Sequence, residues 1–196
     1  MMAISTTTPD YFPSWAEWMT RWPGTVVAFL WGFAEGTLFF ILPDVPLSFV
    51  AMFRPRRALL HMAAIVAGAL LGGAVMFQWS SHSAGARAAV AHVPAVHAAM
   101  FDRASLDLRR HGVWGVSLGP VRGIPYKVYA VEAPAYSTLW PFLLVTIPAR
   151  LWRLVVVWLG FAGAGVLQRK LGRASLAPAL HAIFWIVSYA IYWTTV

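Results

Sequence analysis

Two long apolar runs, residues 25–53 and 112–136, are each interrupted by prolines near the middle and each contain charged side chains. A membrane-spanning helix needs about 20 apolar residues, so both runs are long enough to enter a bilayer. Proline breaks a helix, and a charge at the centre of a membrane helix costs about 2.5–3.5 kcal/mol. Irregular backbone at that depth is tolerated only where protein or a water-filled cavity surrounds it. We therefore interpret each run as two half-helices that form a re-entrant hairpin.

The composition indicates an integral membrane protein. Apolar residues make up 60% of the 196 residues and charged residues 11%, whereas soluble domains have about 45–50% and about 25%. This chain is too apolar for an ordinary soluble domain or a disordered chain. Most basic residues stand at the ends of apolar runs, so membrane topology explains the net charge of +8 better than nucleic-acid binding does. The absence of cysteine excludes disulfides and thiolate metal sites.

The order of segments predicts an all-α membrane protein with two re-entrant hairpins in an inverted repeat and about three to four transmembrane helices. We expect an N-terminal interfacial amphipathic helix over residues 1–22 and a single membrane domain over residues 23–196. The domain is expected to comprise hairpin one, a span, an extramembrane linker, hairpin two and two further spans, over residues 25–53, 58–79, 80–110, 112–136, 139–167 and 176–193. Broken segments at corresponding positions of two halves are typical of inverted-repeat transporters.

The distribution of basic residues predicts an orientation. Seven lie on one side of the predicted spans and four on the other, where two aspartates dilute them. The positive-inside rule places the richer side in the cytoplasm. We therefore expect a multi-pass protein with a cytoplasmic N-terminus.

Charged residues inside the apolar segments are the candidate functional residues, because such residues mark substrate or ion pathways by default. We expect Arg122, Lys127 and Arg150 to bind an anionic head group, since guanidinium and ammonium groups suit phosphate. We expect Glu35 and Asp44 to handle protons or gate access, because desolvation favours the neutral carboxyl and a nearby arginine favours the charged one. Supporting roles are expected for Pro43, Pro46, Pro125, Glu132 and Arg153.

A purely structural interpretation of these charges stays open. Glu35 with Arg122, or Asp44 with Lys127, would then form ion pairs that only clamp the hairpins together. The histidines are scattered without metal-ligand spacing, and the chain has no phosphate-binding loop motif. We expect no metal, no cofactor and no enzyme activity.

The pattern resembles the DedA family, also called SNARE-associated or VTT-domain membrane proteins, and within it the YqaA-like branch. The matching residues are Glu35 with the later Pro43-Asp44-Val45-Pro46, the glycines of 68–72, Arg122-Gly123-Ile124-Pro125-Tyr126-Lys127, and Arg150 with Arg153, so the resemblance covers about residues 25–167. It implies two re-entrant hairpins that face each other across the membrane, and an activity of moving lipids.

These features together lead us to expect a proton-sensitive flippase or scramblase of phosphate-bearing lipids, undecaprenyl phosphate or phospholipid, in a bacterial inner membrane. Its partners would be anionic membrane lipids and protons, with no nucleic acid. Two alternatives stay open: a small-ion or drug/proton antiporter that uses the same buried charges, and a non-transporting membrane scaffold for envelope assembly. The sequence also leaves open a homo-oligomer.

Overall fold

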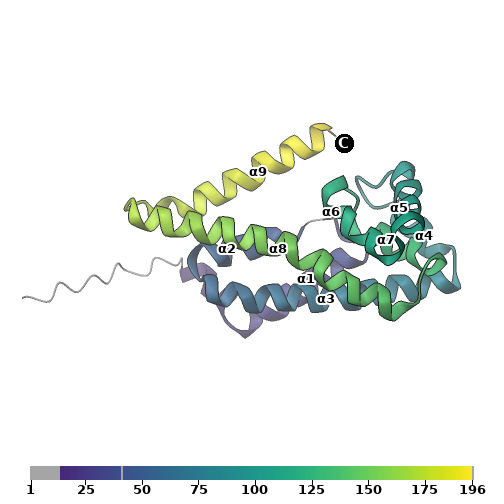
Figure 1. The fold of residues 1–196 in the computed structure, drawn as a ribbon. Helices are drawn as coiled ribbons and strands as arrows, with labels where there is room; N and C mark the ends of the chain where they lie inside the picture. Colours follow the sequence, from purple (N-terminus) through teal and green to yellow (C-terminus); the bar gives the residue numbers. More distant parts are fainter. Residues whose placement is uncertain (1–13, 41, 196) are drawn as a thin grey trace, which may run out of the picture.

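The computed structural model describes residues 14–40 and 42–195, which form helices joined by turns, with no β-strand among them (Figure 1). The longer helices are α1 (Trp22–Gly36), α2 (Asp44–Phe53), α3 (Pro55–His82), α5 (Ala98–His111), α8 (Leu139–Lys170) and α9 (Ala177–Thr195). The shorter ones are η1 (Ser14–Thr20), α4 (Gly85–Ala91), η2 (Gly112–Leu118), α6 (Gly119–Arg122), α7 (Tyr126–Glu132), η3 (Ala133–Ala135) and η4 (Ala174–Leu176). The all-α prediction is confirmed for these residues.

Two helices of the described chain, α3 and α8, are long and apolar enough to cross a membrane. They contain the predicted spans 58–79 and 139–167 and extend slightly beyond them. The third predicted span, 176–193, corresponds to α9, a helix of 19 residues that is not among the helices meeting this criterion. Two membrane-crossing helices are therefore supported, of the three to four that the sequence predicts.

The first interrupted run forms α1 and α2, and the chain turns back between them at residues 37–40 and 42–43, which are not helical (Figure 1). Pro43 is the N-cap residue of α2 and Pro46 lies in its first turn. A proline there removes no helical hydrogen bond, because the first N–H groups of a helix have no partner within it. The predicted break near these prolines is therefore present.

The N-terminal segment differs from the predicted helix over residues 1–22. Residues 14–20 form a short 3₁₀-helix, whereas residues 1–13 lie outside the described residues. The next helix, α1, already begins at Trp22, within the predicted segment, and Pro23 lies in its first turn.

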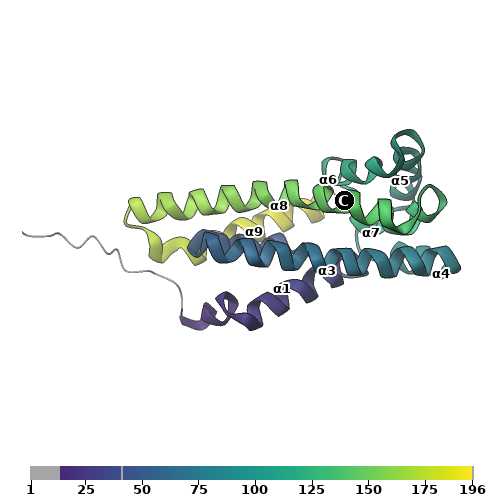
Figure 2. The same ribbon diagram turned by 60° about the horizontal axis from the view of Figure 1, so that its bottom comes forward.

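Glycines bring the C-terminal half of α1 into backbone contact with the middle of α3 (Figure 2). Gly32 of α1 lies against the backbone of Ile65, and Gly68 of α3 lies against that of Phe29. A Cβ added at Gly68 would stand 2.0 Å from the carbonyl oxygen of Phe29. The glycines of 68–72 thus lie in the interface between α3 and α1, as small residues do where two helices approach closely.

The predicted linker, residues 80–110, is a folded cap at one end of the bundle (Figure 1). Apolar side chains of α4 and α5 join one buried cluster with α7 and α8. The linker was expected to begin at residue 80, but Ser80 belongs to α3, which continues to His82. The Ser80 hydroxyl donates a 2.6 Å hydrogen bond to the carbonyl oxygen of Val131.

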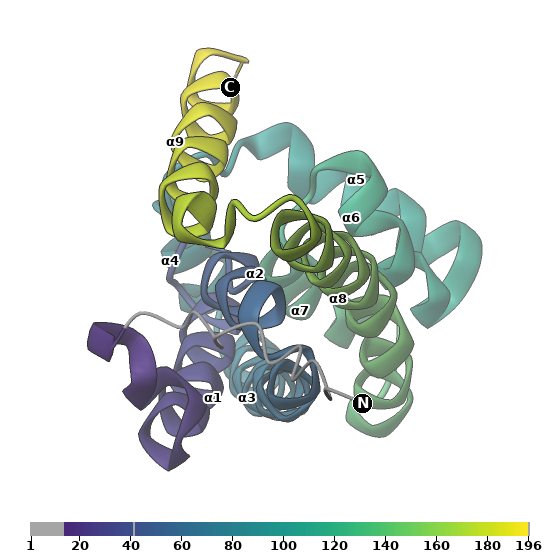
Figure 3. The same ribbon diagram turned by 90° about the vertical axis from the view of Figure 1, so that its left-hand side faces the viewer.

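The second interrupted run forms η2, α6, α7 and η3, with a break at residues 123–125. Gly123 has a φ of +69°, a left-handed conformation that glycine adopts at little cost. Pro125 is the N-cap residue of α7. The break therefore lies beside a proline near the middle of the run 112–136, as predicted. The end-on view in Figure 3 shows α9 leaning away from the bundle formed by α1, α2, α3 and α8.

Candidate functional site

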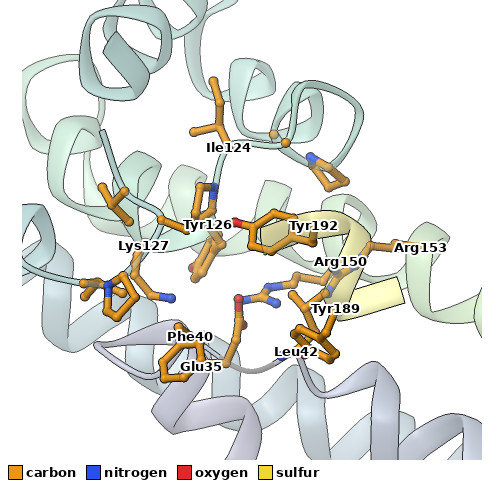
Figure 4. A pocket seen from close by; sticks show the side chains of 18 of the residues that line it. Glu35, Phe40, Leu42, Ile124, Tyr126, Lys127, Arg150, Arg153, Tyr189 and Tyr192 are labelled. Carbon is orange, nitrogen blue, oxygen red and sulfur yellow. Dashed lines mark hydrogen bonds and ion pairs between the residues drawn. The ribbon is translucent and has the colours of Figure 1, made fainter. Parts of the chain in front are cut away.

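Both chain breaks line a single cavity of about 350 Å³. Phe40 and Leu42 come from the first break, and Ile124 and Pro125 from the second. Figure 4 shows charged side chains from α1, α7 and α8 pointing into the same space. One wall consists of side chains from α9, namely Trp185, Ser188, Tyr189, Tyr192 and Trp193. The cavity is the place where the two interrupted segments, α8 and α9 meet.

Glu35 of α1 and Arg150 of α8 form a buried ion pair, with side chains only 5% and 6% exposed. The guanidinium carbon of Arg150 also lies 4.4 Å from the centre of the Tyr126 ring, which is cation–π geometry. The Tyr126 hydroxyl is hydrogen-bonded to that of Thr146 at 3.2 Å. Arg150 is thus held on two sides, yet its Nε has no hydrogen-bond partner among the described residues.

Asp44 and Arg153 form a second ion pair one turn along α8, with Asp44 Oδ2 3.2 Å from Arg153 Nη1. Arg150 and Arg153 are three residues apart, so they lie on the same face of α8. Asp44 stands in the first turn of α2, where the helix dipole favours a negative charge. The two carboxylates of this region are therefore each matched by one arginine.

Lys127 is the third cation of the cavity. Its side-chain nitrogen donates a 2.8 Å hydrogen bond to the carbonyl oxygen of Phe39, which links α7 to the break between α1 and α2. The residue is 2% exposed and forms no ion pair with a carboxylate of the described residues. An ammonium group has three donors, and one is used here. We call Glu35, Asp44, Lys127, Arg150 and Arg153 the charge cluster; its formal charge is +1.

Arg122 is the predicted head-group residue that does not line this cavity. It pairs instead with the buried carboxylate of Asp107 in α5, which also accepts a 2.8 Å hydrogen bond from the Tyr129 hydroxyl. The chain reverses at Gly123, so Arg122 and Lys127 stand on opposite sides of the break. The pairs considered from sequence, Glu35 with Arg122 and Asp44 with Lys127, are not the ones that form.

Glu132, expected in a supporting role, lies in the cap rather than beside the cavity. Its carboxylate accepts hydrogen bonds from Arg87 Nε at 2.7 Å and from the Ser105 hydroxyl at 2.6 Å. It therefore ties α7 to α4 and α5. Pro125 does line the cavity, and Pro43 and Pro46 shape the start of α2.

Aromatic residues of the site were missed by the sequence analysis. Tyr126 supports Arg150, and the Tyr189 hydroxyl accepts a 3.1 Å hydrogen bond from the backbone N–H of Leu42. Trp185, Tyr189 and Trp193 are four residues apart and share one face of α9. That spacing is a usable signal, but aromatic anchoring at a membrane interface produces the same pattern.

The ion pair in the cap gives a stability prediction. Replacing Arg122 by alanine should lower the free energy of unfolding by about 1–3 kcal/mol, because it leaves the buried Asp107 carboxylate with an unsatisfied oxygen. Thermal unfolding of purified protein in detergent measures the change. Arg103→Ala, at an exposed position on the same helix as Asp107, is the control. An equal effect of both substitutions would contradict a specific role for the pair.

No family model, curated protein or solved structure matches the chain.

Proposed function

We propose that this protein resides in a membrane and moves phosphate-bearing lipids across the bilayer, with the cavity as the path of the head group. The observation that carries the proposal is the charge cluster itself. Four of its five members are buried and its formal charge is +1. All members except Asp44 line a cavity whose other walls are largely apolar and aromatic. A phosphate ester attached to a hydrocarbon chain matches both properties.

Exposed apolar side chains on α8 and α9 support a place in the bilayer. Val156 and Leu159 of α8 are 59% and 57% exposed, and Ile183 and Ile186 of α9 are 56% and 68% exposed. Apolar surface costs about 25 cal/mol per Å² in water and nothing comparable in lipid. Large exposed apolar patches in proteins mark contact with a membrane or a partner.

The size of the cavity suits a head group rather than a whole lipid. A volume of about 350 Å³ is at the low end of ligand pockets, so long acyl chains must stay outside it. In this proposal the chains remain in the bilayer beside α9. The two interrupted segments enter the membrane from opposite sides as re-entrant hairpins, as the resemblance to the DedA family implies. Glu35 and Asp44 set the charge of the path by binding or releasing protons. The membrane is then the inner membrane of a bacterium.

Lys127 gives the direct test. Replacing Lys127 by glutamine should slow transport of a fluorescent anionic phospholipid in liposomes about tenfold or more, because it removes the cation not neutralised by a carboxylate. Lys170→Gln is a matched control, since Lys170 is the other lysine of the chain and is exposed at the end of α8. Transport at the unaltered rate in Lys127→Gln would refute the assignment of Lys127 to the head group.

The antiporter alternative has a separate readout in the same liposomes. Each carboxylate of the charge cluster is paired with an arginine and the cluster has no net negative charge, so it does not attract a soluble cation. We therefore expect no uptake of a soluble cation when a pH gradient is imposed. Cation uptake without lipid movement would replace our proposal by the antiporter.

A further inference from the structure

The charge cluster contains one more cationic side chain than carboxylates. Glu35 is paired with Arg150 and Asp44 with Arg153, and Lys127 has no paired carboxylate among the described residues. With both carboxylates ionised, their formal charges sum to +1. Besides Glu35, Lys127, Arg150 and Arg153, the titratable groups that line the cavity are Tyr126, Tyr189 and Tyr192, which are neutral near pH 7. The cluster can therefore neutralise one negative charge of a ligand in the cavity.

Two cationic side chains with unused donors mark where an anionic oxygen would bind. Arg150 Nε is buried and has no hydrogen-bond partner in the described part of the chain. The ammonium group of Lys127 uses one of its three donors on Phe39. Figure 4 shows both side chains directed into the cavity, with Tyr126 between them. Charge-assisted hydrogen bonds from such groups to phosphate oxygens are short and strong.

We infer that the site selects a lipid with a singly charged phosphodiester over one with a doubly charged phosphomonoester; this inference rests on the proposed function. A phosphodiester has one ionisable oxygen and carries a single charge at neutral pH. A phosphomonoester loses a second proton with a pKa of about 6 and then brings a second charge. In a poorly solvated cavity that second charge lacks a counter-charge, and burying an unpaired charge is strongly unfavourable.

The experiment compares two lipids that differ in head-group charge and share the same acyl chains. Purified protein is reconstituted in phosphatidylcholine vesicles with a trace of short-chain fluorescent phosphatidylglycerol or phosphatidic acid, and movement is followed by albumin extraction. At about pH 8, where the monoester is doubly charged, we expect phosphatidylglycerol to move about tenfold faster. At about pH 5 the monoester is singly charged, so the difference should shrink to about twofold or less. Equal rates at pH 8 would overturn the selectivity and leave the proposed function intact.

A variant that alters the net charge of the cluster tests whether this charge determines the selectivity between the two lipids. Asp44→Asn raises the formal charge of the cluster to +2, so transport of phosphatidic acid relative to phosphatidylglycerol at pH 8 should increase about tenfold. Asp102→Asn makes the same change at an exposed position of α5 and should leave the ratio unaltered. Gel filtration establishes that both variants remain folded. If Asp44→Asn does not fold, the comparison of the two lipids at the two pH values still decides the inference.

Two further outcomes separate the possible errors. If neither lipid moves faster than in protein-free vesicles, the proposed function fails together with the selectivity. Soluble dimethyl phosphate carries the same singly charged phosphodiester without a hydrocarbon chain. We expect it not to slow phosphatidylglycerol at millimolar concentration, because a lipid enters from the bilayer. Strong inhibition would show that the site binds a soluble phosphodiester and would refute the inference that its ligand is a lipid.

Discussion

Replacing Glu35 by glutamine should lower the free energy of unfolding by about 3–5 kcal/mol, because it removes one partner of a buried ion pair. The guanidinium group of Arg150 then has no carboxylate partner, although the side chain is only 6% exposed, and it cannot lose its proton. The Tyr126 ring beneath it compensates only in part, since a desolvated cation–π contact contributes about 2 kcal/mol. Unfolding of the detergent-solubilised protein, followed by tryptophan fluorescence, measures the loss.

Replacing Arg150 instead of Glu35 should lower the free energy of unfolding by less. In Arg150→Met the Glu35 carboxyl can take up a proton and become neutral, which an arginine cannot do. The double variant Glu35→Gln with Arg150→Met should recover most of the stability, because apolar or neutral replacements of a buried pair are often tolerated. A double variant no more stable than Glu35→Gln alone would contradict the pairing.

The same double variant distinguishes a lipid transporter from a non-transporting scaffold. If the ion pair only clamps α1 to α8, restoring stability should restore function in the cell as well. If the pair belongs to the head-group path, the stable double variant should still transport lipid about tenfold or more slowly. Lipid transport in liposomes and stability are therefore measured on the same preparations.

Replacing Gly68 by alanine should destabilise the protein by about 1–3 kcal/mol or more, the usual cost of overpacking a filled interface. The added Cβ would stand 2.0 Å from the carbonyl oxygen of Phe29 and 2.8 Å from the backbone nitrogen of Phe33. Both atoms belong to the α1 backbone, so no side-chain rotation relieves the clash. We expect α1 to move away from α3 and to take Glu35 with it, so that lipid transport also falls.

Gly163 of α8 provides the control. A Cβ added there meets nothing within 4 Å, and the residue is exposed in the middle of a helix. Gly163→Ala should therefore stabilise the protein by about 0.5–1 kcal/mol, because alanine loses less conformational freedom than glycine in a helix. Thermal unfolding of both glycine variants under the same detergent conditions tests the two predictions. Similar unfolding temperatures for Gly68→Ala and Gly163→Ala would show that the α1–α3 contact is looser than described.

Local features of the chain were well predicted from the sequence. The break near Pro43 and Pro46 and the break before Pro125 follow from the missing N–H of proline and its fixed φ, which act within a few residues. The small-residue face of α3 was likewise visible in the spacing of its glycines. Apolarity alone predicted α3 and α8, whereas α9, also predicted as a span, forms a helix that is not among the two that meet the criterion for crossing a membrane.

Pairing between distant residues was not predictable in the same way. Glu35 meets Arg150 and not Arg122, although Arg122 stands in the more suggestive motif. The choice depends on the left-handed turn at Gly123 and on the cap, in which Asp107 offers Arg122 a buried partner. No local pattern encodes that partner, because Asp107 lies in a segment expected outside the membrane.

The amino-acid sequence by itself determined that this chain is helical, rich in apolar surface and interrupted at two points beside charged residues, because helix breaking and hydrophobicity are properties of short segments. Only the tertiary structure decided which charges share a cavity, which carboxylate neutralises which arginine, and that Lys127 remains in excess. Those outcomes depend on how α1, α7 and α8 pack, and electrostatic pairing acts over distances in space that bear no relation to separation along the chain.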